Sequence, residues 1–259
     1  MENEQKYSVF KGFSKPFSDL MDHFGTFLKI SSVFALLLTL VSFLFGQSFV
    51  CMLLSLKERV YCSNNILLYV IYVFCKLFVV AVFLRIWYDV VYLQKNFSRQ
   101  YFKENPKRFL RFFGVFIGFI LLNLLPALSL YLLFVRVPNP VWQVEMIYFT
   151  IVSIGFLVPF ICIRFYTNLA EYIEDKPYRN FKEIYEKTRG KLSKIFFSFI
   201  VVLAFSLFVF LVVNNNLRIH VFEPLWLYNI FAEYLFEWIA LLVMAVLLNF
   251  IRVQKESFE

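Results

Sequence analysis

Glycine, proline, cysteine, histidine and charged residues are all scarce in this chain of 259 residues. It contains 7 Gly, 8 Pro, 4 Cys and 2 His, and Asp, Glu, Lys and Arg make up only 17%, against about 25% in a typical globular domain. So few Gly and Pro exclude collagen-like, low-complexity and disordered chains. Four scattered Cys are too few for a disulfide scaffold. No CxxC, phosphate-binding loop or GxGxxG motif occurs.

Hydrophobic residues account for 61% of the sequence and aromatic residues for 21%, with 36 Phe. Six apolar runs are long enough to cross a hydrocarbon core, which needs about 20 helical residues. They cover residues 30–54, 66–87, 112–134, 142–163, 195–213 and 227–251. The runs are apolar on all sides, whereas soluble helices are amphipathic and barrel strands alternate. We therefore predict an all-α, polytopic transmembrane helix bundle of six spans, a single integral membrane domain over residues 1–259.

Lysine and arginine are distributed unevenly around these runs. Most of the 26 cations lie before the first run, in the second and fourth connections, and after the last run, whereas the other connections hold only Lys57, Arg59, Arg136 and Arg218. The positive-inside rule then predicts that both termini are cytoplasmic, in a multi-pass protein of the cell (inner) membrane. The first run is too long for a cleavable signal peptide, so we expect it to act as an uncleaved anchor. The net charge of +8 favours attraction to anionic lipid headgroups, and no soluble basic module indicates nucleic-acid binding.

The segments that lead into the first and fifth runs share a pattern. FSDLMDHFGTFLKI begins at Phe17 and FKEIYEKTRGKLSKI begins at Phe181, and each places Gly four residues before Lys, as Gly25 with Lys29 and Gly190 with Lys194. NPKRFLRF lies midway between them and is the weakest copy. The pattern predicts an internal repeat of about 82 residues, with units near 14–95, 96–179 and 180–259. Each unit would hold one interfacial helix and a two-span hairpin.

The interfacial helices are predicted from apolar residues at helical spacing. Pro16 fits the first position of the first helix, and Asn180 fits the N-cap of the third. These helices would lie among the headgroups on the cytoplasmic side, or they would form a docking surface for a cytoplasmic protein. The candidate lipid contacts are Phe17, Leu20, Met21, Phe24, Phe181, Ile184 and Tyr185.

The segment from Arg164 to Ile195, together with Phe17 to Ile30, resembles the six-span membrane domain of glycerophosphodiester phosphodiesterases. It is also similar to related stand-alone bacterial inner-membrane families of unknown function. The matching positions are Ala170, Tyr172, Phe181 and Gly190. The chain departs from the pattern at Ile184, where these families usually have Ala, and it has no room for the catalytic phosphodiesterase domain. The resemblance implies a fold and a membrane location, and it does not by itself imply an enzyme activity.

Lys76 is the most unusual residue of the apolar runs, because a central Lys costs about 2.5–3.5 kcal/mol on insertion. Its best partner is Glu237 in the last run, where Glu233 lies one helical turn earlier. We predict that Lys76 pairs with Glu237 inside the bundle. The pair would be either a structural ion pair or part of an intramembrane polar site.

Other positions give weaker indications. Arg85 lies near the end of its run, where it can snorkel, and Asp89 one turn on is its expected partner. Gly114 and Gly118 form a GxxxG pattern that favours a close helix contact. Cys51 and Cys62 flank the first hairpin and can form a disulfide if that side is oxidising.

No catalytic constellation is apparent, because the two histidines, His23 and His220, fall on opposite sides of the predicted membrane. We expect a non-enzymatic membrane protein without cofactor or metal, acting in bilayer or lipid organisation or as the membrane partner of another complex. The alternative is a transporter of a small solute or lipid with a polar site near Lys76 and Glu237. A protein partner and a homo-oligomer both stay open.

Overall fold

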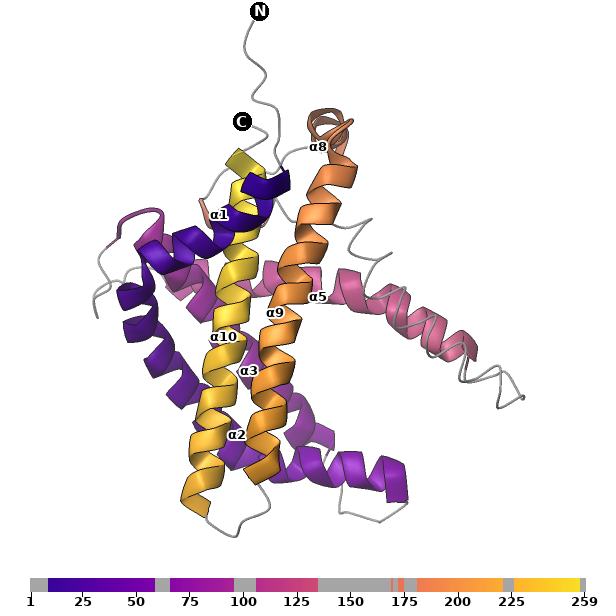
Figure 1. Ribbon diagram of the computed structural model, residues 1–259. Coiled ribbons are helices and arrows are strands. Elements are labelled where there is room, and N and C mark those ends of the chain that lie inside the picture. Colours follow the sequence, from indigo (N-terminus) through magenta and orange to yellow (C-terminus); the bar gives the residue numbers. More distant parts are fainter. Residues whose placement is uncertain are drawn as a thin grey trace, which may run out of the picture. The chain divides into compact units, whose positions relative to one another are not determined.

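The computed structural model describes residues 9–58, 66–95, 106–134, 169, 172–174, 181–220 and 226–256. Within these residues all regular secondary structure is helical (Figure 1), as predicted. The helices are α1 (Val9–Asp22), α2 (Phe24–Glu58), α3 (Ile66–Val91), α5 (Pro106–Phe134), α8 (Phe181–Thr188), α9 (Leu192–His220) and α10 (Trp226–Glu256).

Three stretches of the described helices are long and apolar enough to cross a membrane, as in membrane proteins generally. They are Phe24–Phe45 in α2, Val70–Val91 in α3 and Ile230–Glu256 in α10. They correspond to the first, second and last of the predicted runs. The runs at 112–134 and 195–213 fall within α5 and α9, which are helical there. The run at 142–163 lies outside the described residues.

The chain divides into two compact units, one of which takes in Leu20–Phe109 and Phe205–Val246. In this unit α2 packs against α3, and aromatic rings form the centre of the contact. The buried ring of Phe27 lies 5.6 Å from that of Trp87, 6.2 Å from that of Phe83 and 5.5 Å from that of Trp238 on α10, all edge to face. Such pairs contribute about 0.5–1.5 kcal/mol each beyond the burial of their area. These ring contacts join α2, α3 and α10.

The other unit takes in Met1–Asp19, Leu110–Ala204 and Leu247–Glu259. Here the first part of α9 and the last part of α10 lie side by side, with the rings of Phe199 and Phe250 5.7 Å apart (Figure 1). Helix α1 is attached to both of them through its own backbone. The hydroxyl of Ser198 on α9 lies 3.3 Å from the carbonyl of Val9 and 3.0 Å from that of Lys194 in its own helix, and Asn249 of α10 donates to the carbonyl of Pro16 at 3.1 Å.

The expectation that Pro16 begins the first helix is wrong, because α1 starts at Val9 and Pro16 lies inside it. A proline within a helix removes one backbone hydrogen bond and crowds the preceding turn. Side chains from α9 and α10 contact this backbone at the carbonyls of Val9 and Pro16, so α1 is held by a tertiary attachment as well as by its own hydrogen bonds. Local sequence pattern carries no trace of it. Asn180, predicted as the N-cap of the third helix, lies outside the described residues, and α8 is described from Phe181 onward.

The glycines that the repeat equates have different backbone conformations. Gly25 lies in the first turn of α2, whereas Gly190 lies between α8 and α9 with a φ of 75°. Each of the two repeated segments consists of a helix, a short break and a long apolar helix, with the breaks at His23 and at residues 189–191. The breaks therefore fall at different positions of the repeated pattern.

Candidate functional site

Charged and polar side chains from three apolar helices meet within the unit formed by α2, α3 and the first part of α10. Lys76 lies on α3 within the span that starts at Val70, about 9 Å along the helix by its rise of 1.5 Å per residue. Glu233 and Glu237 lie on α10, within the span that starts at Ile230. Ser42 of α2 completes the cluster. We call these four residues the Lys76 cluster.

The ammonium of Lys76 is the centre of this cluster. Its Nζ contacts Oε1 of Glu237 directly and lies 3.8 Å from Oε1 of Glu233. Ser42 donates a hydrogen bond to the same oxygen of Glu237 at 3.3 Å. The ring of Tyr72, one turn before Lys76 on α3, lies 5.0 Å from the ammonium, within cation–π range. One carboxylate oxygen therefore accepts from two helices at once.

The three charged side chains differ in burial. The side chain of Glu237 is 6% exposed, that of Lys76 23% and that of Glu233 39%. With one cation and two carboxylates, the cluster carries a net charge of −1 when all three groups are ionised. Lys76 and Glu237 neutralise each other in the interior, whereas the surplus charge of Glu233 is on the accessible side. Such an arrangement can lock three helices together, and it can also receive a proton or a cation at Glu233.

The structure thus brings together all three residues proposed for the polar site, Lys76, Glu233 and Glu237. Ser42 and Tyr72 were not predicted from the sequence. The spacing of four residues between Tyr72 and Lys76 is a signal that could have identified Tyr72. Ser42 carried no such signal, because its place beside Glu237 depends on how α2 and α10 pack.

Arg85, further along α3, does not snorkel as the sequence suggested. It is buried within the protein, with Phe83, Trp87 and Tyr88 also buried around it in the sequence. The expected partner is confirmed, since Nε of Arg85 lies 3.3 Å from Oδ2 of Asp89. Most residues from Ala81 to Asp89 are buried by neighbouring protein, which hydropathy alone does not reveal, so Arg85 pairs inside the protein instead of at an interface.

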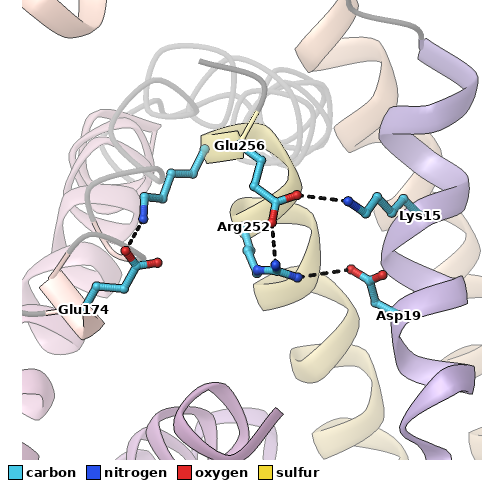
Figure 2. A network of polar contacts seen from close by, with 6 residues as sticks. Lys15, Asp19, Glu174, Arg252 and Glu256 are labelled. Atoms are coloured by element: carbon cyan, nitrogen blue, oxygen red, sulfur yellow. Dashed lines mark hydrogen bonds and ion pairs between the residues drawn. The ribbon is translucent and has the colours of Figure 1, made fainter. Parts of the chain in front are cut away.

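A second polar network, which the sequence did not predict, ties α1 to the end of α10 (Figure 2). On α10, Arg252 contacts Glu256 one turn later, and each of the two residues also forms an ion pair with a residue of α1. Lys15 lies 2.9 Å from Glu256, and Asp19 lies 3.7 Å from Arg252. The contacts thus form a chain of alternating charge between two helices.

A separate ion pair beside this network joins Lys255 of α10 to Glu174 in the short segment 172–174. Lys255 is buried although it lies in the last turn of α10. The oppositely charged spacings of four residues in both helices were visible in the sequence. Their pairing across helices was not, because it depends on the crossing of α1 and α10.

The candidate lipid contacts are placed unequally. On α1 and the start of α2, Met21 is exposed, Phe17 and Phe24 are partly exposed, and Leu20 is buried within the protein. Tyr185 of α8 is exposed. The side chains of Phe181 and Ile184 lie outside the described residues, although both positions belong to α8.

The remaining candidates meet few described neighbours. Apart from the neighbouring residues and backbone of α5 itself, a methyl group added at Gly114 or Gly118 would find no described heavy atom within 4 Å. The side chain of Cys51 and all of Cys62, Arg164 and Ala170 lie outside the described residues. In the described part of the chain, no group of three or more His, Cys, Asp or Glu is placed to hold a metal ion.

No protein-family model matches this chain, and neither a curated protein nor a solved structure matches it.

Proposed function

We propose that this chain is a six-span protein of the inner membrane with both termini in the cytoplasm. The three apolar spans of α2, α3 and α10 support the membrane assignment, and the helical conformation at 112–134 and 195–213 is compatible with two further spans. The cation distribution supports the orientation. The proposal includes an internal repeat of about 82 residues. It also includes a fold like that of the membrane domain of glycerophosphodiester phosphodiesterases.

Within that topology, the protein is a non-enzymatic organiser of the bilayer or a membrane anchor for another complex. The observation that carries this proposal is the surface of the three segments that lead into the first, third and fifth runs. Each exposes a large apolar side chain close to exposed cations: Phe10 and Met21 beside Lys11 on α1, Leu110 beside Arg111 on α5, and Tyr185 near Lys182 on α8. Apolar and basic residues together are the composition that binds an anionic lipid surface.

The attachment of α1 supports the same role. Its backbone bonds to Ser198 and Asn249, and its ion pairs with α10 fix the polar side of the helix. Phe10 and Met21 are left exposed by these contacts. A helix held in place with apolar side chains outward suits insertion into the headgroup layer.

Labelling neighbouring positions of α1 tests this function. In a variant without native cysteines, an environment-sensitive fluorophore is placed at Met21→Cys or at Asp22→Cys, both exposed positions. In nanodiscs containing phosphatidylglycerol, the label at 21 should report an apolar surrounding, and the label at 22 should report water. Identical, water-like emission from both labels would refute lipid contact by this helix.

A transporter is the second candidate, and the accessible carboxylate of Glu233 beside a buried ion pair favours it. An accessible carboxylate such as that of Glu233 can take up and release a proton or a cation. Proteoliposomes holding a pH gradient distinguish the two functions. If the wild-type protein dissipates the gradient faster than Glu233→Gln, transport is supported, and equal rates favour the organising role.

A further inference from the structure

A further charged cluster lies at the end of α3 and is formed by Arg85, Asp89 and Lys95. Asp89 lies between two cations: Oδ2 is 3.3 Å from Nε of Arg85, and Oδ1 is 3.3 Å from Nζ of Lys95. The side chains of Arg85 and Asp89 are each 2% exposed, and that of Lys95 is 34% exposed. The cluster is therefore closed on the protein side and open at Lys95. We call it the Arg85 cluster.

The backbone after α3 places Lys95 in this cluster. Beyond Val91 the chain turns back on the helix, and the backbone N–H of Lys95 donates to the carbonyl of Asp89 at 3.0 Å. Gln94 makes the turn with a φ of 52°, a left-handed conformation that costs a residue with a side chain about 1–2 kcal/mol. The turn at Gln94 thus holds Lys95 beside Asp89, and its left-handed backbone makes this arrangement energetically unfavourable for the turn itself.

The charges and donors of the Arg85 cluster do not balance. Two cations share one carboxylate, so the cluster has a net charge of +1. Among the described residues, the buried Nη2 of Arg85 has no hydrogen-bond partner, while Nε donates to Asp89. Buried polar groups are nearly always hydrogen-bonded, and a bound water or ion is one explanation for a buried group without a protein partner. A buried, unpaired guanidinium donor calls for an acceptor, and the surplus positive charge calls for an anion.

We propose that the Arg85 cluster binds an anionic phosphate group, either the head of an anionic phospholipid or free phosphate. Arginine matches the oxygens of phosphate with its planar set of donors, and lysine adds a point charge. One phosphodiester anion would neutralise the surplus charge and supply an acceptor for Nη2. The cluster lies nine residues beyond Lys76, about 14 Å along the helix. The proposal does not rest on the lipid contacts of α1, whose labelling can fail while phosphate still binds here.

The test uses the full chain, purified in detergent and stripped of lipid, with native mass spectrometry as the readout. The probes are phosphatidylglycerol, phosphatidylcholine and inorganic phosphate, and the variants are Lys95→Ala and the matched control Lys29→Ala. Lys29 is an exposed cation on α2, so both variants lose one positive charge. Losing one charge-assisted hydrogen bond should weaken binding of the anionic probe about tenfold in Lys95→Ala, against less than about twofold in the control.

The probes separate the two sources of the phosphate group. Lys95-dependent binding of phosphatidylglycerol, without competition from inorganic phosphate, identifies a lipid head. Lys95-dependent binding of inorganic phosphate identifies a free anion, and either result supports the site. Equal weakening by the two variants, which means non-specific attraction, would overturn it, as would binding of neither anion. Arg85→Lys keeps the charge and should also lose affinity. If that buried substitution prevents folding, Lys95→Ala still decides the question.

Discussion

Replacing Glu237 by Gln should destabilise the protein far more than replacing Glu233, although the two acids lie one turn apart on α10. Removing one partner of a buried ion pair costs about 3–5 kcal/mol. Lys76 retains some exposure and has Glu233 within 3.8 Å as a substitute partner, so we expect a loss near the lower end, about 3 kcal/mol. Glu233 is more than a third exposed, and its loss should cost less than about 1 kcal/mol.

A double-mutant cycle isolates the interaction itself. Lys76→Met leaves Glu237 buried without its cation and should also cost about 3 kcal/mol. In the double variant both charges are absent, so the combined loss should stay near that of one single substitution. The free energies of unfolding are measured for the folded protein in lipid-containing micelles by denaturant titration. Losses that add up, or equal losses for Glu233→Gln and Glu237→Gln, would refute a buried pair.

Two further predictions concern the attachment of α1 to α10 and the backbone conformation of two glycines. Asn249→Leu removes the donor to the carbonyl of Pro16 and should lower the free energy of unfolding by about 1–2 kcal/mol, with earlier hydrogen exchange confined to α1; unchanged exchange would contradict the attachment. Gly190→Ala should destabilise by about 1 kcal/mol because of its positive φ, whereas Gly25→Ala, in a helical turn, should stabilise by about 0.5 kcal/mol. Thermal unfolding of both variants checks the signs, and shifts in the same direction would count against the difference in conformation.

The contact between Lys76 and Glu237 could be predicted from the sequence for a simple reason. Lysine in the second apolar run lies too far from either end of the run to reach water, and the last run offers an acid at a similar distance from its own start. The hydrophobic runs determine the depth of both groups, so few partners were possible. Whether the pair serves transport or stabilises the helix packing depends on which other groups lie near it in the fold. The sequence alone does not give those neighbours.

The attachment of α1 could not be predicted in the same way. Its apolar residues follow the spacing of an interfacial helix, and that pattern does not distinguish a residue covered by protein, such as Leu20, from an exposed one, such as Met21. Bonds from Ser198 and Asn249 to backbone carbonyls have no sequence signature on the accepting side. Arg85 was misjudged for a related reason, because its burial depends on neighbours distant in the chain.

The topology itself is tested most directly by reporter fusions along the full chain. A fluorescent protein that folds only in the cytoplasm is fused after Lys187 and after the last residue, and a phosphatase active only after export is inserted at residues 59–65. All three reporters should be active if the basic segments stay inside and the first hairpin faces outward. A silent reporter after Lys187, with an active exported phosphatase at the same position, would contradict the proposed six-span arrangement.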